Sequence, residues 1–120
     1  IGGINGLGQV ATAAGWEKGD AWIAELVEGL DHNRHLLAEM LSEHLPQIRY
    51  RPPQATYLSW LDCRDLGLGD NPAEIFMSRG KVALNSGLDF GVEGTGYVRL
   101  NFATSPEMLA MIVERMASAV

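Results

Sequence analysis

Arg99 is the side chain in this sequence whose type and position best suit the binding of a small anion. Around it, Val98, Leu100 and Phe102 alternate with polar or amphipathic residues, which is typical of a strand with one buried face. Arg99 is therefore expected on the face that points away from the core. There a planar guanidinium can bind both oxygens of a carboxylate. The spacing alone leaves open the alternative of an ordinary solvated arginine.

Cys63 is the only cysteine in the sequence, so no internal disulfide can form and a reducing, cytoplasmic setting is expected. A thiolate at Cys63 would be disfavoured by the neighbouring Asp62. We interpret Cys63 as a small, half-buried packing residue and predict no nucleophile at this position.

His32 and His35 are three residues apart in a segment expected to be helical, and two such histidines could share a metal ion. No third ligand is placed to complete such a site, so we interpret both as solvated helix residues and predict no metal. The four glycines within residues 1–8 follow no strand and lack the full G-x-G-x-x-G order, so we predict no phosphate-binding loop there.

The length and composition indicate one ordinary globular domain. The chain has 120 residues, of which 47% are hydrophobic and 20% charged, with a net charge of -6 and no basic run. Nucleic acid is therefore an unexpected partner, because its phosphates would be repelled. No apolar stretch reaches the roughly 18 residues that a membrane helix needs. Because the sequence opens on Ile1 with no starting methionine, we expect it to be a piece of a longer protein.

A long helix over residues 20–43 is predicted from apolar residues at spacings of three and four, with Asp20 as its N-cap. A shorter helix rich in small residues, around residues 10–14, precedes it and is expected to end in the Gly15–Gly19 segment. The apolar stripe of the long helix consists of Ile23, Leu26, Val27, Leu30, Leu37, Met40 and Leu41.

The second half of the chain is predicted to alternate short strands with helices. A helix over residues 106–119 has Ser105 as N-cap and a proline at its first position. Another, over residues 71–79, is expected to end on a left-handed Gly80. The fold class is therefore α+β, a two-layer sandwich with a mainly antiparallel sheet of about four strands and helices on one face. The strands are expected at residues 48–50, 56–61, 81–84 and 97–103.

From about residue 55 onward the sequence resembles the C-terminal small domain of fold-type I, pyridoxal-phosphate-dependent aminotransferases. The resemblance is to the branch that contains the cystathionine β-lyase-like C–S lyases. The earlier residues resemble the segment that crosses from the large domain of such enzymes to the small one. The motifs that carry the resemblance are Ala55-Thr56-Tyr57-Leu58-Ser59-Trp60-Leu61-Asp62, Val82-Ala83-Leu84 through Phe90-Gly91, and Gly94-x-Gly96-Tyr97-Val98-Arg99-Leu100-Asn101-Phe102-Ala103.

The resemblance implies a specific role for Arg99, which matches the family arginine that binds the α-carboxylate of the amino-acid substrate. It also implies pyridoxal 5'-phosphate as cofactor, with the Schiff-base lysine in a large domain that precedes this chain. The only lysines here, Lys18 and Lys81, match no cofactor-binding position. Residues 1–19 would then be the end of the large domain and its linker helix, and residues 20–120 the small domain.

The function implied is that of a lyase or aminotransferase acting on amino acids, homodimeric and cytoplasmic, and inactive as the isolated fragment. The segment Asn85-Ser86-Gly87 departs from relatives that carry a proline before this glycine, and we expect it to border the substrate entrance. Two alternatives are a non-catalytic amino-acid-binding module and a domain that serves dimerisation. Without packing partners, the opening helix is expected to expose an apolar patch and to promote self-association.

Overall fold

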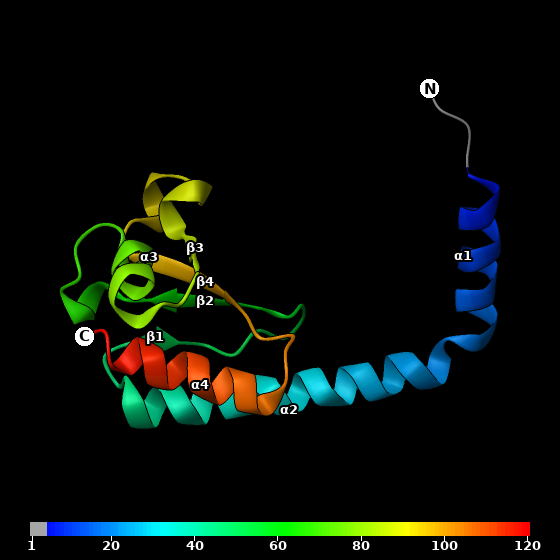
Figure 1. Cartoon of the computed structure of the whole chain (residues 1–120), viewed down its shortest axis with the longest axis horizontal. Helices are drawn as coiled ribbons and strands as arrows, with labels where there is room; N and C mark the ends of the chain where they lie inside the picture. Colours follow the sequence, from blue (N-terminus) through cyan, green and yellow to red (C-terminus); the bar gives the residue numbers. More distant parts are fainter. Residues whose placement is uncertain (1–4) are drawn as a thin grey trace.

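The computed structural model describes residues 5–120, so Gly2 and Gly3, part of the glycine-rich start, lie outside the described residues. Residues 5–120 form four α-helices and one four-stranded sheet in the order β1-β2-β4-β3, with every neighbouring pair antiparallel (Figure 1). The predicted α+β sandwich is confirmed. Among the helices of residues 5–120, none combines the length and the apolar character that crossing a membrane requires.

Two helices open the chain, α1 (Gly6–Lys18) and α2 (Asp20–His44). The predicted break at Gly15–Gly19 is wrong for Gly15, because α1 continues through it to Lys18; one glycine in a helix costs only about 1 kcal/mol. The predicted N-cap at Asp20 is also wrong, since Gly19 is the cap and Asp20 the first helical residue. Because Asp20 lies in the first turn, its carboxylate still interacts favourably with the positive end of the helix dipole.

The sheet consists of short strands, of which two are central. β2 spans Leu58–Asp62 and β4 spans Tyr97–Asn101, while β1 (Arg49–Tyr50) and β3 (Asn85–Ser86) flank them. The strand predicted over residues 81–84 is wrong. Lys81 has a φ of 58°, in the left-handed region, so the chain turns there and pairs only from Asn85 onward.

Helix α3 (Pro72–Ile75) continues as a π-helical turn, Phe76–Gly80. The left-handed cap predicted at Gly80 is wrong, because Lys81 takes that conformation. Gly80 instead allows close packing on the last helix: a Cβ there would lie 2.6 Å from the carbonyl oxygen of Arg115. That helix, α4 (Pro106–Ala117), starts as predicted, with the Ser105 side chain accepting a hydrogen bond from the amide of Met108.

The core lies between the sheet and the paired helices α2 and α4, which cover one face of the sheet (Figure 1). Strand β4 contributes Val98 and Leu100 to it, as its alternation predicts. The second half of the predicted α2 stripe is also buried, through Leu37 and Leu41. The first half is not, since every α2 residue up to Gly29 is exposed.

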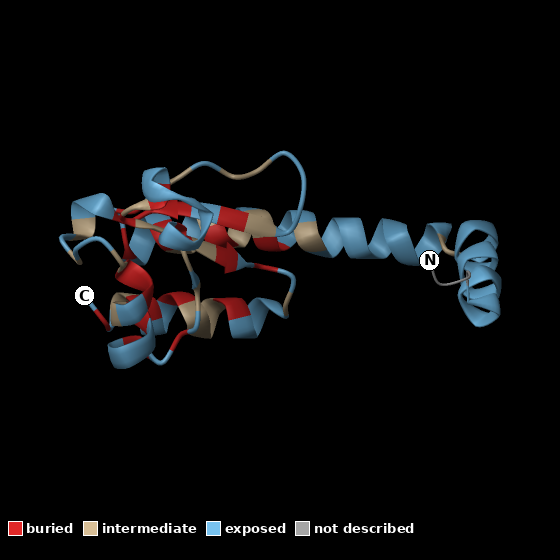
Figure 2. Cartoon of the chain, turned by 90° about the horizontal axis from the view of Figure 1, so that it is seen from above, coloured by how far each residue is buried: buried red, intermediate tan, exposed pale blue. Residues whose placement is uncertain are grey.

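α1 and the first half of α2 project away from this core (Figures 1 and 2). The radius of gyration of 17.5 Å therefore exceeds the roughly 14 Å expected of a compact chain of this length. No residue of α1 is buried. The large apolar side chains exposed along this projection are Leu7, Val10, Trp16, Trp22, Ile23, Leu26 and Val27.

Candidate functional site

Arg99 lies in the middle of β4, on the face of the sheet opposite the helices. Its neighbours in the strand, Val98 and Leu100, are buried beneath it, while Arg99 itself is half-buried. The face predicted for Arg99 from the alternation of the strand is therefore confirmed. Antiparallel pairing with β2 on one side and β3 on the other holds the backbone of this residue in place.

Within residues 5–120, the guanidinium of Arg99 makes one hydrogen bond and one cation–π contact, and both partners come from the segment of residues 85–90. Nη2 donates a hydrogen bond of 3.0 Å to Oδ1 of Asn85. The Cζ atom lies over the ring of Phe90, 4.7 Å from its centroid. Neither neighbour carries a charge, so the guanidinium is oriented but keeps its full positive charge.

The Nε donor of Arg99 is among its unused N–H groups. Its Nε is buried and has no hydrogen-bond partner within residues 5–120. None of the ion pairs formed by these residues includes Arg99. The hydrogen bond from Nη2 to Asn85 is the one that the guanidinium forms within residues 5–120, so its other N–H groups can bind a ligand that brings acceptor oxygens. A carboxylate fits, since it can accept two hydrogen bonds from one guanidinium.

Three aromatic side chains continue the arrangement along the same face of the sheet, and we call Trp60, Tyr97 and Phe90 the aromatic ladder. The Phe90 ring meets Trp60 edge-on at 5.4 Å between centroids, and Trp60 stacks on Tyr97 at 5.6 Å. Trp60 and Phe90 were not predicted as residues of the site. The register that places Trp60 opposite Arg99 is a property of the sheet and leaves no local signal in the sequence.

A second arginine ends the ladder, but its charge is already paired. Arg64 lies over the Tyr97 ring at 4.9 Å and donates to both carboxylate oxygens of Asp62, at 2.8 and 2.7 Å. The Arg64 guanidinium lowers the pKa of Asp62 to about 2, and Asp62 in turn raises the pKa of Arg64. Of the two arginines in contact with the ladder, only Arg99 is therefore free to bind an anion.

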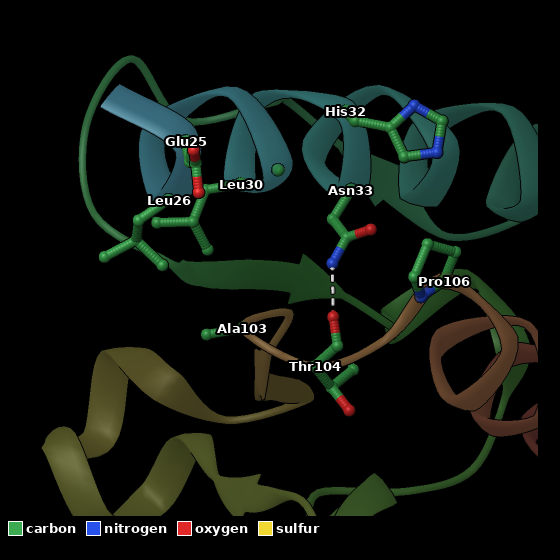
Figure 3. Close-up of a pocket in the computed structure, with 9 residues that line it drawn as sticks. Glu25, Leu26, Leu30, His32, Asn33, Ala103, Thr104 and Pro106 are labelled. Atoms are coloured by element: carbon green, nitrogen blue, oxygen red, sulfur yellow. Dashed lines mark hydrogen bonds between the residues drawn. The ribbon is translucent and has the colours of Figure 1, made fainter. Parts of the chain in front are cut away.

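A cavity of about 390 Å³ lies elsewhere, between α2 and the connection from β4 to α4 (Figure 3). Asn33 lines it and joins the two elements: its Nδ2 donates to the carbonyl oxygens of Phe102 and Thr104, at 3.0 and 2.7 Å. Arg99 does not line this cavity. The cavity is thus separate from the arginine site. The structural role of Asn33 is to bond α2 to the connection between β4 and α4.

The remaining reactive side chains lie apart from this arrangement. Lys18 and Lys81 are both exposed, and Nζ of Lys81 donates to the carbonyl oxygen of Ser78 at 2.8 Å. Cys63 is fully buried rather than half-buried as predicted. Burial, with a smaller contribution from the charge of Asp62, raises the pKa of the Cys63 thiol to about 12, so the thiol stays protonated.

His32 and His35, two of the three histidines of α2, differ in their contacts. Nδ1 of His35 lies 2.8 Å from the carbonyl oxygen of Asp31, one turn earlier in the helix, while His32 lines the cavity beside Asn33 (Figure 3). Within residues 5–120, no three metal-ligating side chains converge on one point.

No family model matches the chain. Individual proteins do. The chain is 44% identical to a Mycobacterium tuberculosis protein named as a cystathionine β-lyase, over 96% of this chain and 32% of the relative. It is 34% identical to the cystathionine β-lyase PatB of Bacillus subtilis, over 99% of this chain and 31% of the relative. The chain thus spans about a third of the length of the curated relatives it matches.

Solved structures share the fold. A structure from Corynebacterium diphtheriae, named as a PLP-dependent β-cystathionase, matches with a TM-score of 0.93 and 40% identity, over 99% of this chain and 32% of that one. The PLP-bound C–S lyase of Staphylococcus hominis matches with a TM-score of 0.90 and 29% identity, over 99% and 32%. The chain therefore has the same fold as the matching part of these structures.

Proposed function

Because the chain belongs to the fold-type I family of pyridoxal-phosphate-dependent cystathionine β-lyases and aminotransferases, we propose that it is the C-terminal small domain of such an enzyme. We propose that Arg99 binds the α-carboxylate of an amino-acid substrate. The observation that carries this proposal is the state of the guanidinium: it is held by neutral neighbours, has no carboxylate partner within residues 5–120, and keeps a buried Nε without an acceptor.

The role of the domain is to orient the substrate. A carboxylate held by two hydrogen bonds from one planar guanidinium cannot rotate freely. Arg99 therefore fixes the direction of the bonds at the substrate's α-carbon, which is the part of catalysis that positioning can provide. Pyridoxal phosphate, when bound, supplies the electron sink for the charge that develops at that carbon.

The residues of this chain fit a substrate-binding part better than a cofactor-binding part. Both lysines are exposed, and Asn85, which binds the guanidinium of Arg99, contributes an acceptor there and no donor. We therefore assign the cofactor lysine, the partner of the pyridine nitrogen and the phosphate-binding groups to a large domain. Residues 1–19 would be its end and linker helix, and residues 20–120 the small domain.

The exposed apolar projection of α1 and α2 supports this assignment. Seven large apolar side chains along it are 41% to 84% exposed, although such surfaces in soluble proteins are normally buried against a partner. We propose that the large domain covers this surface and that the complete enzyme is a homodimer. A cytoplasmic setting agrees with the single, buried and reduced cysteine, Cys63.

The experiment replaces Arg99 in the full-length enzyme with alanine and with lysine. Cleavage of cystathionine is measured as release of the amino-acid fragment and of ammonia, and amino transfer is measured in parallel with a 2-oxo acid. We expect the KM for the amino acid to rise at least tenfold in Arg99→Ala, because a charge-assisted pair contributes about 1.5–3 kcal/mol. Arg99→Lys keeps the charge but loses the two-point geometry, so its KM should lie between that of the parent and that of Arg99→Ala.

Two controls complete this experiment. The visible absorbance of the bound cofactor should be the same in all variants, which separates substrate binding from loss of the cofactor. Arg51→Ala removes an exposed arginine outside the site and should leave KM unchanged. An Arg99→Ala enzyme with the KM of the parent would contradict the assignment.

A second candidate, a dimerisation module, is favoured by the same exposed apolar projection. In that case the 120-residue chain alone should form a defined dimer through α1. Static light scattering at several concentrations separates the candidates: a defined dimer supports the module, while open-ended association is expected of a surface that a large domain normally covers.

A further inference from the structure

We propose that Asn85 and Phe90 are positioning residues for Arg99, which hold its guanidinium in place without neutralising it; this inference rests on the proposed function. Asn85 is the direct cross-strand partner of Arg99 in the pairing of β3 with β4, and its Oδ1 accepts the only hydrogen bond from the guanidinium within residues 5–120. The Cζ atom of the same group lies over the ring of Phe90. The guanidinium is thus held at Nη2 by Asn85 and against the ring by Phe90.

The chemical identity of these neighbours is what makes the arrangement useful. An aspartate in place of Asn85 would bind Arg99 more strongly, but it would cancel the charge and repel an incoming carboxylate. An amide oxygen carries only a partial charge. The face of an aromatic ring attracts a cation through its quadrupole, again without a net charge. Asn85 and Phe90 therefore orient Arg99 and leave its charge for the ligand.

The segment that carries both residues is itself held firmly. Oγ of Ser86 donates to Oδ1 of Asn71 at 2.8 Å, which ties β3 to the start of α3. Gly87 and Gly94 pack backbone to backbone, so closely that a Cβ on Gly87 would lie 2.0 Å from the carbonyl oxygen of Gly94. The two 3-10 turns η3 (Gly87–Phe90) and η4 (Val92–Gly94) are therefore locked against each other.

The aromatic ladder fixes Phe90 from the other side. Its ring meets the edge of Trp60, which is stacked on Tyr97, and both of these residues belong to the central strands of the sheet. Phe90 is thus held between Arg99 and a rigid platform, although half of its surface is exposed. The position of the guanidinium is consequently determined by three elements, β2, β3 and η3, besides its own strand.

The decisive variant is Asn85→Asp in the full-length enzyme, because it keeps the size of the side chain and changes only its charge. We expect the KM for the amino acid to rise at least tenfold, with kcat changed by less than about threefold and with unchanged cofactor absorbance. Asn85→Ala, which truncates an exposed side chain, should raise KM by a smaller factor of about three. Phe90→Leu, which keeps an apolar side chain but no ring, should behave like Asn85→Ala.

A substrate analogue separates positioning from a merely structural effect. An amine that lacks the α-carboxylate should bind the parent and the Asn85→Asp enzyme equally well, because Arg99 has nothing to bind in it. A structural defect would weaken both ligands. The matched control is Asn5→Asp, the same chemical change at the N-cap of α1, and it should leave KM unaltered.

The outcomes distinguish this inference from the proposed function. A raised KM in Arg99→Ala together with parental KM values in Asn85→Asp and Asn85→Ala would overturn the positioning role and leave the function intact. Equal weakening of the amino acid and of the amine analogue would also overturn it. A parental KM in Arg99→Ala would overturn the proposed function itself.

Discussion

Trp60 and Arg99 are direct cross-strand partners in the pairing of β2 with β4, and both side chains point away from the helices. The strand sequence shows that Trp60 alternates with Ser59, but it does not show which of the two enters the core. In the structure the small Ser59 is fully buried and donates or accepts a hydrogen bond with the hydroxyl of Tyr50 at 3.0 Å. The large Trp60 is thereby left on the open face beside Arg99.

The aromatic ladder should contribute measurably to stability. Trp60 takes part in both ring contacts of the ladder, and each aromatic pair contributes about 0.5–1.5 kcal/mol beyond the area it buries. We expect Trp60→Ala to lower the free energy of unfolding by about 1–3 kcal/mol, and Trp60→Phe by less, because a ring is retained. Urea unfolding of the 120-residue chain measures both. Equal losses in the two variants would show that the ring contacts contribute nothing.

Asn33 offers a test with a pH dependence of known sign. Its Nδ2 donates to two carbonyl oxygens. In an aspartate at this position a carboxylate oxygen, which can only accept, would face these two carbonyl oxygens. Burial and these carbonyls should raise the folded-state pKa of the new carboxyl. Asn33→Asp should therefore be least destabilising near pH 4, where the carboxyl is protonated, and increasingly so towards pH 7.

The matched control for Asn33 is Asn101→Asp. Asn101 is exposed, and its Oδ1 accepts a hydrogen bond from the amide of Ala103, which a carboxylate can also accept. Its unfolding free energy should change by only a few tenths of a kcal/mol at either pH, as surface substitutions usually do. A flat pH profile for Asn33→Asp, parallel to that of Asn101→Asp, would contradict the prediction.

Two glycine-to-alanine changes should have opposite signs. Gly87→Ala would force a Cβ into the carbonyl group of Gly94, and overpacking of this kind costs about 1–3 kcal/mol. Gly29→Ala meets open space within α2, where alanine is favoured over glycine by about 1 kcal/mol. Thermal unfolding of both variants beside the parent gives the signs directly. A stabilised Gly87→Ala would disprove the close packing of η3 on η4.

The pair formed by Asp62 and Arg64 should contribute stability that acid removes. The pKa of Asp62 is lowered from 3.8 to about 2 in the folded chain, so its contribution is present above pH 4 and is lost as the pH falls towards 2. Asp62→Asn should abolish that part of the pH dependence, as measured by urea unfolding between pH 5 and 2. Because Arg64 is partly exposed, added salt should weaken the effect in the parent chain. If the unfolding free energies of the parent and of Asp62→Asn fell in parallel with pH, the contribution assigned to this pair would be refuted.

Much of the fold follows from local sequence signals. The alternation around Arg99 and the Ser105-Pro106 start of α4 are decided by neighbouring residues, and both predictions are confirmed. The errors lie where a distant contact overrides a local preference. Gly80 suggested a left-handed cap, but it is needed for the close approach of Arg115 in α4. Residues 81–84 have the composition of a strand, but Lys81 turns the chain before it can pair.

The candidate site divides in the same way. The sequence by itself determined that an arginine lies on the outer face of a rigid strand, because alternation along a strand is a property of consecutive residues. Only the tertiary structure decided what surrounds it, since Asn85, Phe90 and Trp60 reach Arg99 through strand register and through the packing of η3 on η4. Register joins Arg99 to residues 14 and 39 positions away, and no local pattern records that choice.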